Sequence, residues 1–192
     1  MSTPLHSPAS DPDDAAMLRL GGGEDLALDE LMDRWSARLT SFLQRMTGNH
    51  TAAADLAQET FVRIYQARER FRPEGTFKAL LFQVAANLAR NHARWRKRHP
   101  ETSIDREEFP EPAAAEHSDP AREAQAAETA RAVKAAVLSL DDDLRAPLVM
   151  SVYEGLDHKS IAAALGCSPK AVEMRIYRAR QSLRQQLSEF IE

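Results

Sequence analysis

The sequence predicts an all-α protein with two small helical domains joined by a flexible acidic linker. Apolar side chains recur every three or four residues in several segments, which is the spacing of one face of a helix. Alternating β-branched runs are absent and only 7 glycines occur among 192 residues, so no segment is typical of a strand. A proline-containing acidic stretch separates a three-to-four-helix bundle from a helix-turn-helix domain.

The first domain is expected at residues 26–99, after an acidic tail at residues 1–25 that we expect to be disordered. Residues 1–34 carry eight acids against two bases, and composition leaves open whether the tail restrains DNA binding or contacts a partner. Three apolar stripes predict three helices, with breaks at Gly48-Asn49 and at Arg72-Pro73-Glu74-Gly75. The third stripe places on its inner face Phe77, Leu80, Leu81, Val84, Ala85, Leu88, His92 and Trp95.

The linker is expected at residues 100–123 and the second helical domain at residues 124–190. Residues 101–129 carry nine acids, two bases and three prolines, and too few large apolar side chains to offset the entropy cost of ordering. Positive charge is concentrated elsewhere, although the net charge is -4. Residues 76–100 carry six Lys or Arg and no acid, and residues 158–187 carry six and one acid. Two such basic segments predict contacts with nucleic acid.

A helix-turn-helix is the sharpest local pattern, at residues 156–180. Asp157 is placed to cap a short helix, which Gly166 ends in the left-handed conformation. A second helix follows, capped by Ser168 and with Pro169 at its first position. Recognition helices present their first turns to base edges, while Arg and Lys further along neutralise phosphates. An ordinary helical hairpin with a solvated face is the alternative. The expected DNA contacts are Ser168, Lys170, Ala171, Glu173, Met174, Arg175, Tyr177, Arg178 and Arg180.

Further motifs lie in the first domain: Asp-Leu-Ala-Gln-Glu-Thr-Phe-Val-Arg-Ile-Tyr at 55–65, Gly-Thr-Phe-Lys-Ala-Leu-Leu at 75–81 and Val-Ala-Ala-Asn-Leu-Ala-Arg-Asn at 84–91. Together they resemble region 2 of the extracytoplasmic-function (ECF) sigma factors of the sigma-70 family, and the helix-turn-helix resembles region 4. The resemblance covers residues 26–98 and 125–187. It implies a factor that binds bacterial RNA polymerase core and promoter DNA, directs transcription initiation, and is not an enzyme.

The resemblance also implies where polymerase would bind. In this family the helix with the Asp-x-x-Gln-Glu pattern docks on the clamp helices of the largest polymerase subunit, and the beta flap is a further expected partner. Residues three and four apart share one helical face, so a polar docking face is expected there, with an exposed Phe beside it. A plain solvated face is the alternative. The expected polymerase-binding residues are Asp55, Gln58, Glu59, Phe61 and Arg63.

The next helix in the family opens the minus-ten promoter element and holds a flipped base. Asn87 and Asn91 match its asparagines, and the loop 72–76 is expected to form part of the base pocket. Exposed helix residues without this role are the alternative. The expected minus-ten DNA-binding residues are Phe77, Asn87, Arg90, Asn91, Arg94, Arg96, Lys97 and Arg98, and the helix-turn-helix would bind minus-thirty-five DNA.

Two positions depart from the family. The family usually has Trp where Leu80 stands, and many members carry a base where Glu173 stands. An acid at that position favours a cytosine amino group over a phosphate. We expect the third domain of larger sigma factors to be missing, since residues 100–124 are too short and polar to form it. In the family the acidic connector runs through the polymerase channels, and we extend this to residues 100–123 as a hypothesis.

No cofactor or metal is expected. Cys167 is the only cysteine, the six histidines are scattered, and Asp141-Asp142-Asp143 point in different directions at a helix start. An enzyme is therefore a weak alternative. A conventional helix-turn-helix regulator is a stronger one, although it gives the motif at 55–65 no purpose. We expect a cytoplasmic protein without membrane insertion, and the resemblance implies an anti-sigma factor as a partner.

Overall fold

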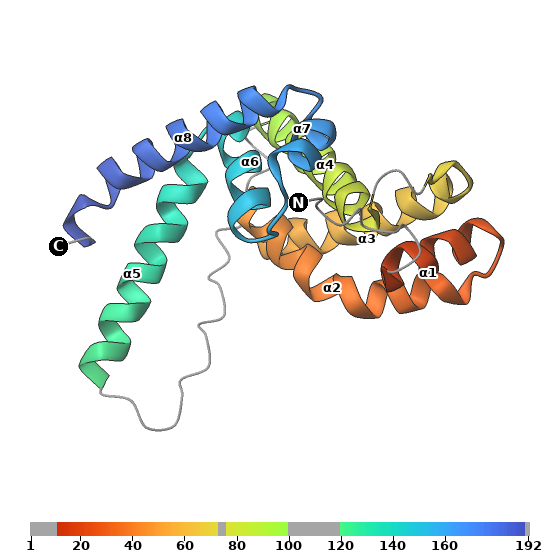
Figure 1. Ribbon diagram of the computed structural model, residues 1–192. Coiled ribbons are helices and arrows are strands. Elements are labelled where there is room, and N and C mark those ends of the chain that lie inside the picture. Colours follow the sequence, from red (N-terminus) through yellow and green to blue (C-terminus); the bar gives the residue numbers. More distant parts are fainter. Residues whose placement is uncertain (1–10, 73–75, 100–119, 191–192) are drawn as a thin grey trace, which may run out of the picture.

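The computed structural model describes residues 11–72, 76–99 and 120–190, and over these residues the chain is built of helices and turns (Figure 1). The first half contains α1 (Pro12–Gly21), α2 (Leu26–Thr47), α3 (His50–Ala67), the short 3-10 helix η1 (Arg68–Arg70) and α4 (Phe77–Arg98). The second half contains α5 (Pro120–Ser139), α6 (Asp142–Val152), α7 (His158–Leu165), α8 (Pro169–Gln186) and η3 (Ser188–Phe190). The predicted all-α class is confirmed.

An aromatic cluster holds α2 and α4 together in the first half. Trp35 and Phe42 of α2 meet Phe82 of α4 edge to face, with ring centroids 5.9 and 4.9 Å apart. Phe77 meets Trp35 in the same way at 6.1 Å. All four rings are buried, and each such pair adds about 0.5–1.5 kcal/mol beyond its hydrophobic contribution. The cluster therefore fixes how the DNA-facing candidate α4 lies on the bundle.

Helix α1 shows that the expected disordered tail at residues 1–25 is wrong over its second part. Residues 12–21 are helical and pack on α2 and α4, while residues 1–10 lie outside the described part of the chain. The acidic composition concealed the helix because its few buried apolar residues are spaced at one and three, which is enough for one buried face. The fully buried residues of α1 are Ala16, Met17 and Leu20.

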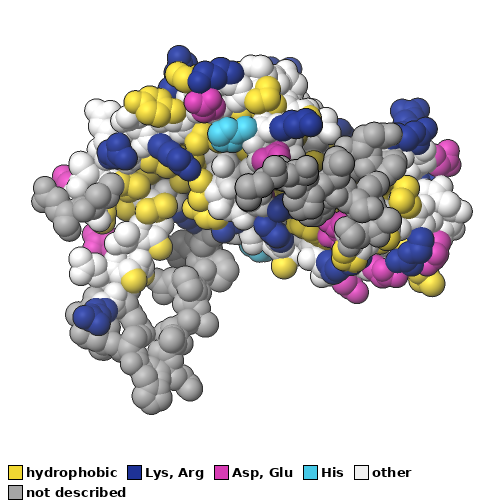
Figure 2. Space-filling model, viewed as in Figure 1, with side chains coloured by type: hydrophobic (Ala, Val, Ile, Leu, Met, Phe, Trp, Pro, Cys, Tyr) yellow, Lys and Arg dark blue, Asp and Glu magenta, His cyan; other side chains and the backbone are white. Residues whose placement is uncertain are grey.

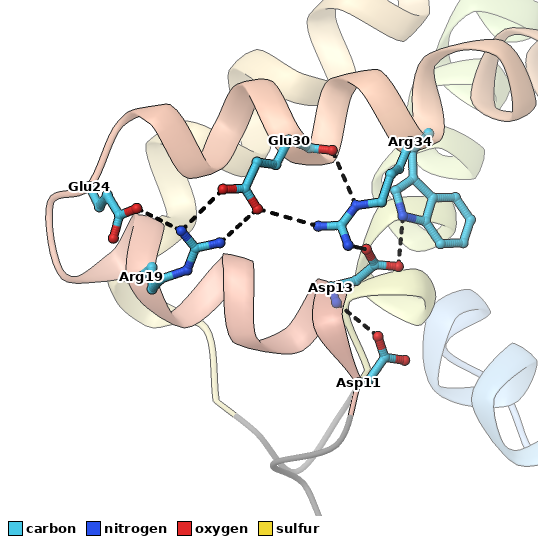
Figure 3. Close-up of polar contacts among 7 residues, drawn as sticks. Asp11, Asp13, Arg19, Glu24, Glu30 and Arg34 are labelled. Carbon is cyan, nitrogen blue, oxygen red and sulfur yellow. Dashed lines mark hydrogen bonds and ion pairs between the residues drawn. The ribbon is translucent and has the colours of Figure 1, made fainter.

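Carboxylates of α1 anchor it to the bundle. Asp13 accepts a hydrogen bond from the indole nitrogen of Trp35 at 2.8 Å and pairs with Arg34 at 3.1 Å (Figure 3). Asp14 is 4% exposed and accepts a hydrogen bond from the backbone amide of Phe77 at 2.5 Å. Because that amide belongs to the first turn of α4, where helix amides lack partners, Asp14 ties α1 to the start of α4.

A chain of ion pairs continues along the surface of α1 and α2 (Figure 3). Arg19 pairs with Glu24 at 2.6 Å and with Glu30 at 2.7 Å, and Arg34 reaches Glu30 at 3.8 Å. These side chains are between 37% and 50% exposed, so each pair is worth little on its own. The network therefore orients α1, while the buried apolar residues hold it.

Helix ends in the second half follow the predicted capping pattern. The side chain of Asp157 accepts from the amide of Ser160 at 2.7 Å, and the hydroxyl of Ser168 accepts from the amide of Ala171 at 3.2 Å. Gly166 ends α7 at φ 64°, in the left-handed region that L side chains rarely adopt. The turn between α7 and α8 is therefore encoded by local residues.

The start of α5 corrects the predicted linker. Residues 120–123 are helical rather than part of the connection, because Pro120 is well suited to the first position of a helix. The remaining expected linker residues, 100–119, lie outside the described part of the chain.

Polar bridges join the two halves. Nε of Arg38 in α2 lies 2.6 Å from a carboxylate oxygen of Glu154, whose side chain is 2% exposed. Arg145 in α6 donates to the backbone carbonyl of Met46 at 2.5 Å. Figure 1 shows α7 running beside α4, and these two helices contact each other directly. In this arrangement the buried residues of both halves form one continuous core.

Candidate functional site

The outer face of α3 carries the predicted polymerase-binding residues. Asp55 and Gln58 are exposed, and Glu59 accepts from Nε of Arg63 at 2.7 Å. The two side chains of this pair are 45% and 47% exposed, so water screens the pair and both groups can reach a partner. Val62, which is 48% exposed, adds an apolar contact to the same face.

Phe61 does not belong to this surface. It is 4% exposed and continues the inner stripe of α3 between Ala57 and Ile64. The expectation of an exposed ring at this position is wrong, because the spacing of four and three places Phe61 on the inner stripe, opposite Glu59. Its ring supports α3 from within.

The second half of α4 exposes a polar and basic strip. Asn87 and Asn91 are exposed one turn apart, and Arg90 donates to the side-chain oxygen of Asn87. No acid occurs in α4, so the positive charge here has no neutralising group on its own helix. Arg96 is half-buried, and the exposed cations are Arg94, Lys97 and Arg98.

Phe77 is fully buried, so the prediction that it contacts a flipped base is wrong. It is the first apolar residue of the α4 stripe and its ring belongs to the aromatic cluster. A cavity of about 290 Å³ does lie nearby, at the position of Leu80. Helix α7 forms one of its walls, and residues 73–75 of the expected pocket loop lie outside the described residues. The lining includes Arg72, Thr76, Leu80, Gln83, Ser160, Ala163 and Ala164.

Helix α8 exposes charged, aromatic and apolar side chains to solvent. Lys170 pairs with Glu173 at 3.0 Å, with 73% and 53% of the two side chains exposed. Met174 and Tyr177 are 40% and 57% exposed, beside exposed Arg178 and Arg180. Figure 2 shows Lys and Arg side chains along the edge formed by α8, and Asp and Glu side chains gathered at the α1 and α2 end. The predicted inward residues are Val172, Ile176, Ala179 and Leu183; the first three are buried and the last is half-buried.

Some predicted contacts of α8 are less accessible. Ala171 and Arg175 are half-buried, and the hydroxyl of Ser168 is already used to cap the helix.

Trp95 was assigned to the inner stripe of α4, and the structure places it outside. It is 44% exposed and stacks on His99 with ring centroids 4.9 Å apart. His92, from the same stripe, is half-buried; burial lowers its pKa below the ordinary value, and Arg96 adds to the shift. The clue in the sequence was the run of cations around Trp95, because a core position is seldom surrounded by charge.

Within the described ranges, no group of three or more His, Cys, Asp or Glu is placed to hold a metal ion. No described helix is both long and apolar enough to cross a membrane.

Comparisons with known proteins identify both halves. The model of Sigma-70 region 2 matches residues 31–99, and that of Sigma-70 region 4 matches residues 130–183. RNA polymerase sigma factor CarQ of Myxococcus xanthus is 34% identical over 175 residues, covering 90% of this chain and 96% of that protein. The chain belongs to the ECF sigma factors of the sigma-70 family. The ECF sigma factor SigE of Mycolicibacterium smegmatis is 32% identical, covering 94% of this sigma factor and 70% of that one.

A solved structure agrees with the fold. The structure of CnrH in complex with the cytosolic domain of CnrY matches with a TM-score of 0.67 and 27% identity, covering 93% of this chain and 99% of that one. As a member of this family, the sigma factor directs transcription initiation. The match to region 2 decides against a conventional regulator built on a helix-turn-helix alone.

Proposed function

We propose that this sigma factor binds RNA polymerase core through the outer face of α3. The support is an exposed polar surface in which Asp55, Gln58 and Glu59 lie on one side of the helix, with Arg63 held beside them by its ion pair. Charged groups on such a rim confer specificity and speed of association more than affinity. Phe61 has no direct part in this contact, because it is buried.

For the minus-ten element, the proposed surface is the outer strip of α4. The amides of Asn87 and Asn91 offer donors and acceptors to an extruded base, and the cations that follow them neutralise the backbone. Extruding a base costs a few kcal/mol, so these contacts must act together with polymerase.

For the minus-thirty-five element, the proposed surface is the start of α8 in the major groove. Lys170 and Glu173 lie nearest the bases, and Arg178 and Arg180 lie further along the exposed face toward the phosphates. The ion pair between Lys170 and Glu173 must rearrange for either side chain to contact a base edge.

Binding both elements at once requires the two halves to separate. The elements lie about 25 base pairs apart, or roughly 85 Å at about 3.4 Å per base pair. Helices α4 and α8 belong to halves that share one core in the described arrangement. The described arrangement is therefore closed. In the proposed promoter-bound form the two halves lie apart.

An anti-sigma factor is the proposed regulator. CnrH, a similar solved protein, is in complex with the cytosolic domain of CnrY. Here an apolar groove of about 400 Å³ runs between the halves, and an occupant touching both would favour the closed arrangement. The groove is lined by Ser41, Gln44, Arg45, Ala130, Val133, Lys134, Val137, Leu138 and Tyr153.

The match of both sigma regions within one chain carries the proposal. Run-off transcription with purified polymerase core and a pool of promoter fragments tests it. The intact protein should give promoter-specific transcripts, and the double substitution Gln58→Ala with Glu59→Ala should lose core binding and transcripts together. The double substitution Asp29→Ala with Asp33→Ala, at exposed positions of α2, is the control and should behave as the intact protein.

Two results would overturn the proposal. If the intact protein neither binds core nor supports initiation, the assignment of α3 and both DNA surfaces fails. If Gln58→Ala with Glu59→Ala transcribes as well as that control, the docking surface lies elsewhere.

A further inference from the structure

The exposed end of α4 carries a stack of two rings. Trp95 and His99 lie with their planes 25° from parallel and their centroids 4.9 Å apart. Nδ1 of His99 lies 3.0 Å from the backbone carbonyl of Trp95, which fixes the orientation of the imidazole. The other tryptophan, Trp35, is 8% exposed and lies in the core, whereas Trp95 is 44% exposed. A large, oriented apolar surface therefore faces solvent at this end of the helix.

This stack continues the line of the candidate base-contacting asparagines. Asn87, Asn91, Trp95 and His99 follow one another at intervals of four, so they form a single stripe along α4. Eight residues of helix span about 12 Å, which is roughly three or four nucleotides at about 3.4 Å each. A strand that follows α4 past the two amides would next meet the indole ring.

The surrounding charge favours nucleic acid as the occupant. Arg94, Lys97 and Arg98 are exposed on the same turns, Arg96 is half-buried, and α4 contains no acid. Exposed rings set among cations are the combination by which proteins hold single-stranded nucleic acid, because each base offers a face to a ring and each phosphate a charge to a cation.

We propose that Trp95, oriented by His99, is a stacking platform for an unpaired base of the opened promoter. The inference rests on the proposed function, because an unpaired base is present only if this sigma factor opens DNA with polymerase. Trp95 binds the base face, which carries no sequence code, while Asn87 and Asn91 read a base edge. The platform therefore holds the strand in place without adding to sequence preference.

Promoter DNA with 2-aminopurine at single positions across the minus-ten segment provides the test, with holoenzyme assembled from core and the full chain. This base is bright when unstacked and dim when stacked on a ring. With the intact protein, one or two positions should stay dim after opening. Trp95→Ala should brighten those positions severalfold and lower the yield of open complex about tenfold, toward the low end of base–aromatic stacking. Trp95→Phe should keep most of both signals.

Control variants separate stacking from general damage. Leu18→Ala removes an apolar side chain of similar exposure, 47%, from α1 and should change neither signal. His99→Ala should reduce the yield less than Trp95→Ala, because it removes the support and leaves the platform. Circular dichroism melting of each variant establishes that it folds.

The outcomes distinguish a failure of this inference from a failure of the proposed function. If the intact protein opens no promoter, the proposed function fails. If it opens promoters and Trp95→Ala leaves every 2-aminopurine position and the yield unchanged, the platform is overturned. Equal losses with Trp95→Ala and Trp95→Phe, without any position brightening, would also overturn it, since they would indicate a packing role.

Discussion

The two halves of this sigma factor reach stable helical folds by different means. In the first half, Trp35, Phe42, Phe77 and Phe82 interlock edge to face. In the described part of the second half no aromatic side chain is buried, and the core consists of aliphatic and alanine side chains. Helix caps occur in both halves, at Asn49 and Thr76 in the first and at Asp157 and Ser168 in the second. What distinguishes the first half is ring packing between residues distant in sequence.

Two carboxylates, one in each half, show the same contrast between a contact that is distant in sequence and one that is local. Asp14 in the first half and Asp157 in the second each accept a hydrogen bond from a backbone amide in the first turn of a helix. Burial raises the pKa of Asp14 above its ordinary value, although the bond to Phe77 opposes the shift. Hydrogen bonds to Ser160 lower the pKa of the exposed Asp157. A hydrogen bond from a backbone amide therefore lowers the pKa of an exposed carboxylate. For a buried carboxylate it only opposes the rise in pKa that desolvation causes.

The largest effect is expected from breaking the aromatic cluster. Phe82→Ala should lower the free energy of unfolding by about 3–5 kcal/mol, because it removes a buried ring that contacts both Trp35 and Phe42. Ile161→Val in the second half should cost about 0.5–1.5 kcal/mol. Urea unfolding monitored by circular dichroism measures both. A smaller cost at Phe82 than at Ile161 would contradict the proposed difference between the halves.

The structural features that depend on a local sequence pattern could be predicted from the sequence. The helices after α1, the turn at Gly166 and the caps at Asp157 and Ser168 were foreseen, because each is encoded within a few residues. Helix α1 was missed, since an acidic composition masked a short buried stripe. Its anchor, the bond from the Phe77 amide to Asp14, joins residues 63 positions apart and leaves no local trace.

The candidate surfaces were predicted as segments rather than as individual side chains. Phe61 and Phe77 were placed on functional surfaces and are buried, although the period of three and four already assigned both to inner stripes. Trp95 was placed inside and is exposed, because periodicity alone cannot tell where a core ends along a helix. The contact between the halves had no signal in the sequence, since the pair Arg38 and Glu154 are 116 positions apart.

Gly48→Ala should give the next largest effect. Gly48 has φ 73°, and a Cβ there would lie 3.1 Å from a methyl carbon of Leu138 in the other half. Backbone strain and crowding together should cost roughly 2–4 kcal/mol. Gly166→Ala, at φ 64° with nothing within 4 Å, carries the strain alone and should cost about 1–2 kcal/mol. Thermal unfolding compares them, and equal costs would show that Leu138 does not press on Gly48.

Glu154→Gln should loosen the contact between the halves by about 1–2 kcal/mol. The change keeps an acceptor for Arg38 but removes the charge, and the 45% exposure of Arg38 limits the loss. Small-angle scattering should show a larger radius of gyration. Glu24→Gln, which affects an exposed ion pair within the first half, is the matched control and should leave the radius unchanged. Identical scattering from all three proteins would contradict a role of the pair in closure.

The smallest effects are expected from the two carboxylates, and they should differ in sign. Because the folded pKa of Asp14 is raised, its ionisation costs stability as pH rises above the ordinary value of 3.8. Asp14→Asn keeps an acceptor for the Phe77 amide, so its stability relative to the intact protein should increase with pH. The folded pKa of Asp157 is lowered, so its contribution is present above 3.8 and is lost as pH falls through the folded pKa.

Asp157→Asn should therefore lose stability relative to the intact protein as pH rises, the opposite trend to Asp14→Asn. Urea midpoints of the three proteins between about pH 3 and pH 7 measure both trends, because a carboxylate titrates within this range. Parallel trends would mean that burial does not set the sign of the carboxylate contribution. Opposite trends would locate at the helix-turn-helix a cap that weakens as pH falls below 3.8, and at the start of α4 one that weakens as pH rises above 3.8.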